Sequence, residues 1–215
     1  MSKRAAPTKK IPQAGVAALV AAGRLFHQRG WVPATAGNFS VRLDAKSLAV
    51  TTSGRHKGEL ANGDFMRVDL AGRPLDAGKR SSAETLLHCQ LYRHAPQVGA
   101  VLHTHSPAST VLSRSHDSIR LANYELLKIF EGIQTHETAV EVPVFENDQD
   151  IARLSRVVDA HMKTGRAAHA YLIRGHGLYA WGRTVDEARH RVEALEFLFE
   201  CELHERLLKA RGDRP

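Results

Sequence analysis

Short apolar segments that favour β-strands alternate along this chain with longer segments that favour helices, and this order most constrains the fold. Apolar residues recur at helical spacing over 12–28 and in a long segment after Thr184. Strand patterns fall at 39–43, 48–52, 65–69, 98–103, 140–144, 170–174 and 178–181. Tight turns join several of these strands, which requires antiparallel pairing. The order predicts an α/β fold with a central mixed or antiparallel sheet and helices on both faces.

The chain is long enough for one full domain, predicted here as residues 12–215 after a flexible basic tail at 1–11. It contains no apolar run of about 18 residues, so no membrane span is expected. Cys89 and Cys201 lie far apart in expected helices. They are predicted to be buried structural thiols and not a disulfide, which fits a reducing cytoplasm.

The formal net charge of +7 raises the question of nucleic-acid binding. The basic residues are scattered, many of them near the two ends, and aromatic residues make up only 6% of the chain. No alternation of basic and aromatic residues appears. The charge therefore favours attraction of a small anionic substrate over a nucleic acid.

Two carboxylates lie at the starts of predicted helices, and a role at the helix start is enough to explain each of them. Ser81 and Glu84 have the spacing of a capping box for a helix over about 83–93. Glu125 begins a short helix predicted over 124–131, where a carboxylate complements the helix dipole. From these patterns neither residue stands out as catalytic. Other predicted helix starts are Ser106 before Pro107, Asp148, and the pair Thr184 and Glu187.

His103 and His105 are two residues apart at the end of an apolar strand. A continuing strand would project both imidazoles from one face, a geometry suited to one metal ion. A catalytic zinc needs a third protein ligand, and His176, between Gly175 and Gly177, is the best candidate. No spacing rule links His176 to the pair. The remaining histidines fit ordinary surface or core positions: His88, His94, His116, His161, His190 and His204.

Three small, polar segments could present hydroxyl and backbone N–H groups to a phosphate. They are 35–40, 51–54 and the serine pair Ser81 and Ser82. None matches a Walker loop or a dinucleotide fingerprint, and ordinary turns have similar sequences. In a basic chain with an expected metal site, they favour a small, phosphorylated substrate.

Taken together, several motifs resemble the class II aldolase/adducin family from about the first helix to Leu208. They are 35–38 with Ser40, 52–54, 81–84, the His103 and His105 pair, and 175–177 with Trp181 and Gly182. Within the family, segments 124–132, 142–147 and 175–182 are most similar to its dehydratases that act on 5-methylthioribulose 1-phosphate in methionine salvage.

The resemblance implies a class II aldolase-like three-layer α/β fold and a homotetramer with active sites at subunit interfaces. It implies one Zn²⁺ per subunit on His103, His105 and His176. The acid/base would be Glu125, whereas the family's aldolases use the position of Glu84, so the role of Glu84 stays open. Phosphate contacts would fall on Asn38, Ser53, Gly54, Ser81 and Ser82.

The implied function is a hydro-lyase that dehydrates 5-methylthioribulose 1-phosphate to 2,3-diketo-5-methylthiopentyl 1-phosphate. The alternative is a sugar-phosphate aldolase or epimerase that uses the same zinc site with Glu84 as its essential carboxylate. A third hypothesis is an adducin-like binding module without metal, and the presence of all three candidate ligands argues against it. Neither nucleic acid nor membrane is expected as a partner.

Overall fold

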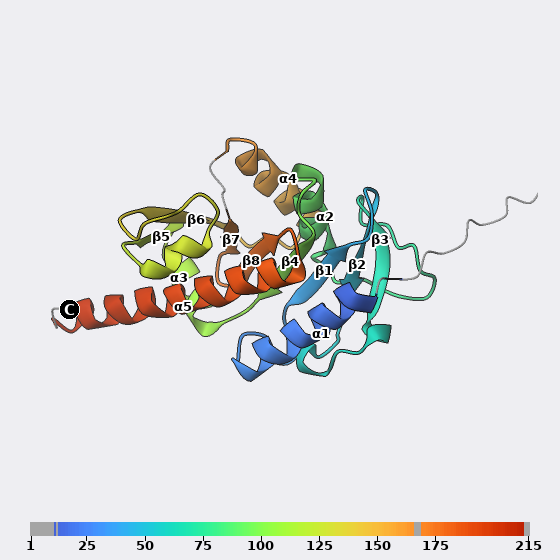
Figure 1. Cartoon of the computed structure of the whole chain (residues 1–215), viewed down its shortest axis with the longest axis horizontal. Helices are drawn as coiled ribbons and strands as arrows, with labels where there is room; N and C mark the ends of the chain where they lie inside the picture. Colours follow the sequence, from blue (N-terminus) through green and yellow to red (C-terminus); the bar gives the residue numbers. More distant parts are fainter. Residues whose placement is uncertain (1–10, 12, 166–168, 213–215) are drawn as a thin grey trace, which may run out of the picture.

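The computed structural model describes residues 11, 13–165 and 169–212 (Figure 1). Its α-helices are α1 (Gln13–Gln28), α2 (Thr85–His94), α3 (Pro107–Ser113), α4 (Ile151–Met162) and α5 (Val185–Ala210). Short 3-10 helices are η1 (Lys57–Glu59), η2 (Asn62–Asp64) and η3 (Glu125–Ile129). The strands are β1 (Asn38–Arg42), β2 (Ser47–Thr51), β3 (Phe65–Asp69), β4 (Ala100–Thr104), β5 (Ser118–Ala122), β6 (Ala139–Phe145), β7 (Ala170–Ile173) and β8 (Gly177–Gly182).

Within the described residues the strands form one sheet in the order β3-β2-β1-β4-β8-β7-β6-β5. Neighbouring strands run antiparallel except β6 and β7, which are parallel and are joined through α4. Parallel neighbours need such a crossover, whereas the antiparallel pairs follow from short turns. The predicted mixed sheet is confirmed. It places β4, which carries His103, at the centre between β1 and β8.

Helices cover both faces of the sheet, and the alternation of side chains along β4 shows which helices lie where. Ala100 and Leu102 belong to a core cluster with residues of α1, α3 and α5. Val101 points the other way, into a second cluster with residues of α2 and α4. The chain therefore forms the predicted three layers. Helix α5 crosses the sheet and continues past it to Ala210 (Figure 1).

Most sequence-predicted elements are found within about two residues of their expected ends. The strand at Ser118–Ala122 was not predicted, although its exposure alternates as expected for an edge strand. The helix expected over 124–131 is the shorter 3-10 helix η3. Asp150, not Asp148, caps α4 by accepting from the backbone N–H of Arg153, while Asp148 pairs with the Arg153 side chain.

The predicted tail at 1–11 lies outside the described residues except for Ile11, which packs against the core near α1. Cys89 is a buried free thiol, as expected, whereas Cys201 is a free thiol that is only partly buried. Of the helices in the described parts of the chain, none is long and apolar enough to span a bilayer.

Candidate active site

Three histidines from two separate parts of the chain bring their ring nitrogens together at the end of β4. The Nε2 atom of His103 lies 2.8 Å from Nε2 of His105 and 3.3 Å from Nε2 of His176. One nitrogen from each ring lies within 4.8 Å of the others. His103 is fully buried, while His105 and His176 are half-buried. The site is therefore anchored in the core and open on one side.

Two glycines place His176 against β4. Gly175 has a φ of +62°, a conformation that glycine adopts without strain, and it makes the turn from β7 toward β8. Gly177 lies so close to β4 that a Cβ there would be 2.0 Å from the carbonyl oxygen of Thr104. His176 is consequently held beside the strand that carries His103.

Replacing Gly177 with Ala is expected to destabilise the fold by about 1–3 kcal/mol, because β8 and β4 must separate to admit the methyl group. The same shift would move His176 away from His103. Chemical denaturation and metal titration of the variant test this. Gly63→Ala is the control, because nothing lies within 4 Å of a Cβ there and its φ, like that of Gly177, is outside the left-handed region. Wild-type metal affinity in Gly177→Ala would contradict the prediction.

The donor set fits a divalent transition metal. Nδ1 of His103 lies 2.9 Å from the carbonyl oxygen of Leu178, which can only accept, so Nδ1 carries the proton and Nε2 presents a lone pair. Burial, then the nearby His103 and His176, lower the pKa of His105 to about 3, which keeps its ring neutral. Three imidazole nitrogens that face one another are a ligand set typical of catalytic zinc.

Glu84 reaches the same three-histidine cluster. Its carboxylate oxygens lie 3.2 Å from Nε2 of His103 and 3.0 Å from Nε2 of His176. Asn38 and Tyr179 donate to it at 2.7 Å and 2.8 Å. Burial alone would raise the pKa of Glu84, but His103 and His176 outweigh burial and hold the pKa well below its usual range.

The predicted capping role of Glu84 is wrong. Glu84 is the N-cap residue of α2, which begins at Thr85, and its side chain caps no backbone N–H group. The hydrogen-bond donors of Asn38 and Tyr179 draw the carboxylate toward the sheet instead. Glu84, whose spacing from Ser81 matched a capping box, therefore faces the histidines.

A buried chain of hydrogen bonds orients Asn38. Its amide nitrogen donates to Glu84, so its oxygen must accept from Nε2 of His88. Nδ1 of His88 then accepts from Ser40 at 2.7 Å, and Ser40 accepts from Tyr92 at 2.9 Å. Burial lowers the pKa of His88 to about 3. His88, expected to be an ordinary core histidine, fixes which end of the amide meets Glu84.

A cleft of about 300 Å³ opens beside Glu84 and His105. Four of the five residues predicted to contact phosphate line it: Asn38, Ser53, Gly54 and Ser82. Ser81 instead pairs with Thr52 as a β-bridge and is not among the lining residues described. The fold therefore gathers three distant polar segments around one opening.

Lys57 also lines this cleft and was not singled out by the sequence analysis. Its side chain is buried, and Nζ donates to the carbonyl oxygens of Thr35 and Arg55, each at 2.6 Å. The available sequence signal for Lys57 was its position, three residues after Gly54 in a candidate phosphate-binding segment.

Glu196 supports the histidine-bearing strand from behind. It is 2% exposed, on α5, and accepts hydrogen bonds from Thr104 at 2.5 Å and from Ser106. Burial raises its pKa to about 7. Thr104 and Ser106 flank His105, so their hydroxyl groups tie the turn to α5 on the side away from the metal site.

Glu125 lies on η3, and its described contacts do not include the histidines. Its side chain is 71% exposed and pairs with Lys128 at 2.5 Å and His136 at 3.7 Å. The hydrogen bond from Lys128 lowers the pKa of Glu125. Glu125 does not line the cleft beside His105. The single chain thus brings Glu84, but not Glu125, to the histidines.

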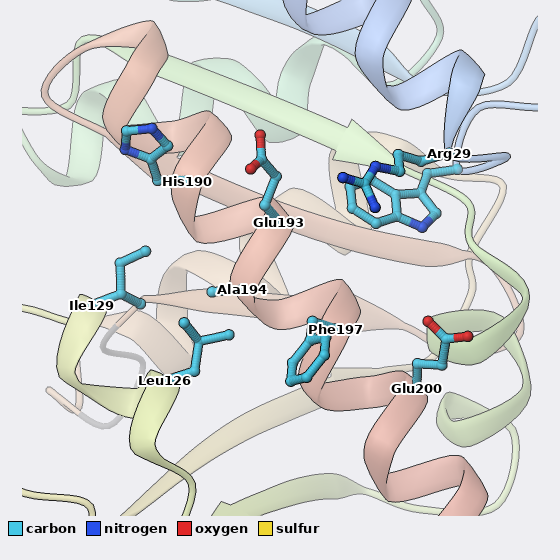
Figure 2. Close-up of a pocket in the computed structure, with 9 residues that line it drawn as sticks. Arg29, Leu126, Ile129, His190, Glu193, Ala194, Phe197 and Glu200 are labelled. Atoms are coloured by element: carbon cyan, nitrogen blue, oxygen red, sulfur yellow. The ribbon is translucent and has the colours of Figure 1, made fainter.

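The residues next to Glu125 border a separate groove of about 320 Å³ (Figure 2). Leu126 and Ile129 of η3 face Phe197 of α5 across it, and Arg29 lies at one end. Phe197 is 54% exposed and Ile129 is 37% exposed. Large apolar side chains of this kind on an open surface are typical of contact with another protein.

The chain is similar to known proteins over most of its length. Residues 17–203 match the family described as "Class II Aldolase and Adducin N-terminal domain". A protein of Gluconacetobacter diazotrophicus named methylthioribulose-1-phosphate dehydratase is 56% identical over 91% of this chain and 96% of its own length. A protein of Pseudomonas syringae pv. syringae with the same name is 53% identical over 90% of this chain and 96% of its own.

Solved structures show the same fold. The crystal structure of L-fuculose-1-phosphate aldolase from Thermus thermophilus superposes with a TM-score of 0.76 at 27% identity, over 92% of this chain and 98% of that one. YgbL of Escherichia coli, described as a putative aldolase/epimerase/decarboxylase, gives 0.75 at 28% identity, over 94% and 92%. The chain therefore belongs to the class II aldolase and adducin family.

Proposed function

We propose that this protein is a Zn²⁺-dependent methylthioribulose-1-phosphate dehydratase of methionine salvage, active in the cytoplasm. The observation that carries the proposal is the cluster of His103, His105 and His176 in a chain more than half identical to proteins of that name. The substrate is 5-methylthioribulose 1-phosphate, and the product is 2,3-diketo-5-methylthiopentyl 1-phosphate.

The three histidines would hold the metal, which supplies a Lewis acid for the substrate's carbonyl oxygen. The hydroxyl groups of Ser53 and Ser82 and the backbone at Gly54 would bind the phosphate in the cleft. A carboxylate, proposed as that of Glu125, removes the proton from C3. The same group, once protonated, gives a proton to the departing C4 hydroxyl, which leaves as water. The enol product then becomes the diketone.

We further propose that the enzyme is a homotetramer in which Glu125 reaches the histidines of a neighbouring subunit. Two observations support this: the carboxylate of Glu125 is exposed, and it has no described contact with the cleft of its own chain. The apolar groove beside Glu125, with Phe197 and Ile129 exposed, would be covered by a second copy. Light scattering of the purified protein tests the assembly. A monomer that is fully active would contradict it.

The proposed function is tested by product analysis. Purified protein with measured zinc content is incubated with 5-methylthioribulose 1-phosphate, and the product is identified by mass spectrometry. We expect loss of one water molecule per substrate and a diketone absorbance. Unchanged substrate with fully zinc-loaded protein would overturn the proposal.

The contacts of Glu84 with His103 and His176 favour a second candidate, a sugar-phosphate aldolase that uses Glu84 as acid/base. The similarity to L-fuculose-1-phosphate aldolase makes L-fuculose 1-phosphate the first substrate to try. Release of dihydroxyacetone phosphate from it, without dehydration of 5-methylthioribulose 1-phosphate, would favour the aldolase.

A further inference from the structure

Lys57 is a buried cation with no carboxylate beside it. It is 2% exposed, and no ion pair of its ammonium is found among the described residues. Its hydrogen bonds go to two neutral acceptors, the carbonyl oxygens of Thr35 and Arg55. Burial lowers the pKa of Lys57 to about 8, against the longer-range attraction of Glu84. Buried lysines are rare unless paired, because losing water costs free energy that an anion normally offsets.

The surroundings of Lys57 are suited to an anion. The cleft that it lines is otherwise bordered by neutral hydrogen-bond donors, including Thr52, Ser53 and Ser82, and by Gly54. Glu84 is the other charged residue among those lining the cleft, and it is held at the histidine end by His103. The cleft therefore has a carboxylate at its histidine end and a cation without a counter-ion elsewhere on its wall.

The backbone at Lys57 is fixed against α1. A Cβ on Gly23 would lie 2.3 Å from the carbonyl oxygen of Lys57, and a Cβ on Gly58 would lie 2.6 Å from the ring of His27. Such close packing leaves η1 no room to move toward α1. With the backbone fixed in this way, the two hydrogen bonds of Nζ hold the ammonium at a defined position on the cleft wall.

We infer that the ammonium of Lys57 binds the phosphate group of the substrate directly and gives the cleft its preference for phosphate esters over neutral sugars. Two of its three N–H groups are taken by the carbonyl oxygens of Thr35 and Arg55, which leaves one for the ligand. The inference rests on the proposed function, in which the substrate is a phosphorylated ketose. It goes beyond that function by naming Lys57 as the charged residue that selects phosphorylated substrates.

The test measures binding, not turnover. Dihydroxyacetone phosphate and dihydroxyacetone are titrated into zinc-loaded wild type and Lys57→Met by calorimetry. We expect Lys57→Met to weaken binding of the phosphate ester by about tenfold to a hundredfold, the effect of one hydrogen bond to a charged group. Binding of dihydroxyacetone itself should be nearly unchanged.

Lys79→Met is the matched control. Its Nζ also donates to two carbonyl oxygens, those of Gly63 and Phe65, each at 2.8 Å, but Lys79 is exposed and does not line the cleft. We expect wild-type affinity for both ligands in Lys79→Met. Equal losses for both ligands in Lys57→Met, or no loss for either, would overturn the inference.

If Lys57→Met does not fold, the wild-type protein still provides a test. Lys57 carries its charge below its pKa, so affinity for inorganic phosphate should fall as the pH rises above about 8. Affinity that stays constant between about pH 7.5 and about pH 9.5 would overturn the inference. A protein that binds the ester through Lys57 but does not dehydrate 5-methylthioribulose 1-phosphate would disprove the proposed function alone.

Discussion

Replacing Glu125 with Gln is expected to lower the turnover of 5-methylthioribulose 1-phosphate by about a hundredfold to ten-thousandfold, the usual contribution of general acid–base catalysis. Gln has nearly the shape of Glu but cannot take the C3 proton. Because the proposed zinc ligands are His103, His105 and His176 and do not include Glu125, bound zinc should stay at the wild-type level. Steady-state kinetics and metal analysis of the same preparation measure both quantities.

Two further variants make this result interpretable. Glu131→Gln removes another exposed carboxylate close in sequence, which pairs with Arg183, and we expect near wild-type turnover from it. Glu84→Gln alters a carboxylate in contact with His103 and His176, so metal content should change together with activity. Full activity of Glu125→Gln alongside an inactive, zinc-loaded Glu84→Gln would reverse the roles assigned to the two residues.

Replacing His103 with Ala is expected to abolish metal binding and to lower the activity by about a thousandfold or more. The activity falls because the substrate's carbonyl oxygen then loses its Lewis acid. His103 is the buried member of the cluster, and its Nε2 faces those of both other histidines. Metal analysis after gel filtration and single-turnover kinetics check the two losses.

His204→Ala provides the control for loss of an imidazole, since His204 is exposed on α5. It should keep metal and activity. Because His103 is also part of the core, the thermal midpoint of His103→Ala should be compared with that of metal-stripped wild type. Stoichiometric zinc in a folded His103→Ala protein would refute the proposed ligand set.

Some features of the site could be predicted because they depend on short-range geometry. Side chains two apart on a strand share a face, which is why His103 and His105 could be paired from sequence. Glycines on both sides of His176 marked it as the candidate third ligand, and Gly175 makes the turn that precedes it. The strand order that brings His176 to β4 is a long-range property, so no spacing rule could reveal it.

Other features depended on contacts that no local pattern encodes. Glu84 matched a capping box, yet partners distant in sequence, Asn38 and Tyr179, hold its carboxylate elsewhere. His88 looked ordinary because its importance comes from the amide that it orients. Lys57 became distinctive only when its burial, and its lack of an ionic partner among the residues that the structure describes, were visible. In each case tertiary packing decided the role of the side chain.

The alternation along the end of β4 also limits how this segment can change in evolution. His103 and His105 face the metal site, while Thr104 and Ser106 bind Glu196 on the opposite face. Inserting or deleting one residue before His103 would exchange the two faces, moving both histidines toward a buried carboxylate and both hydroxyls toward the cleft. Homologous sequences should therefore vary by substitution here and change length only in the neighbouring loops.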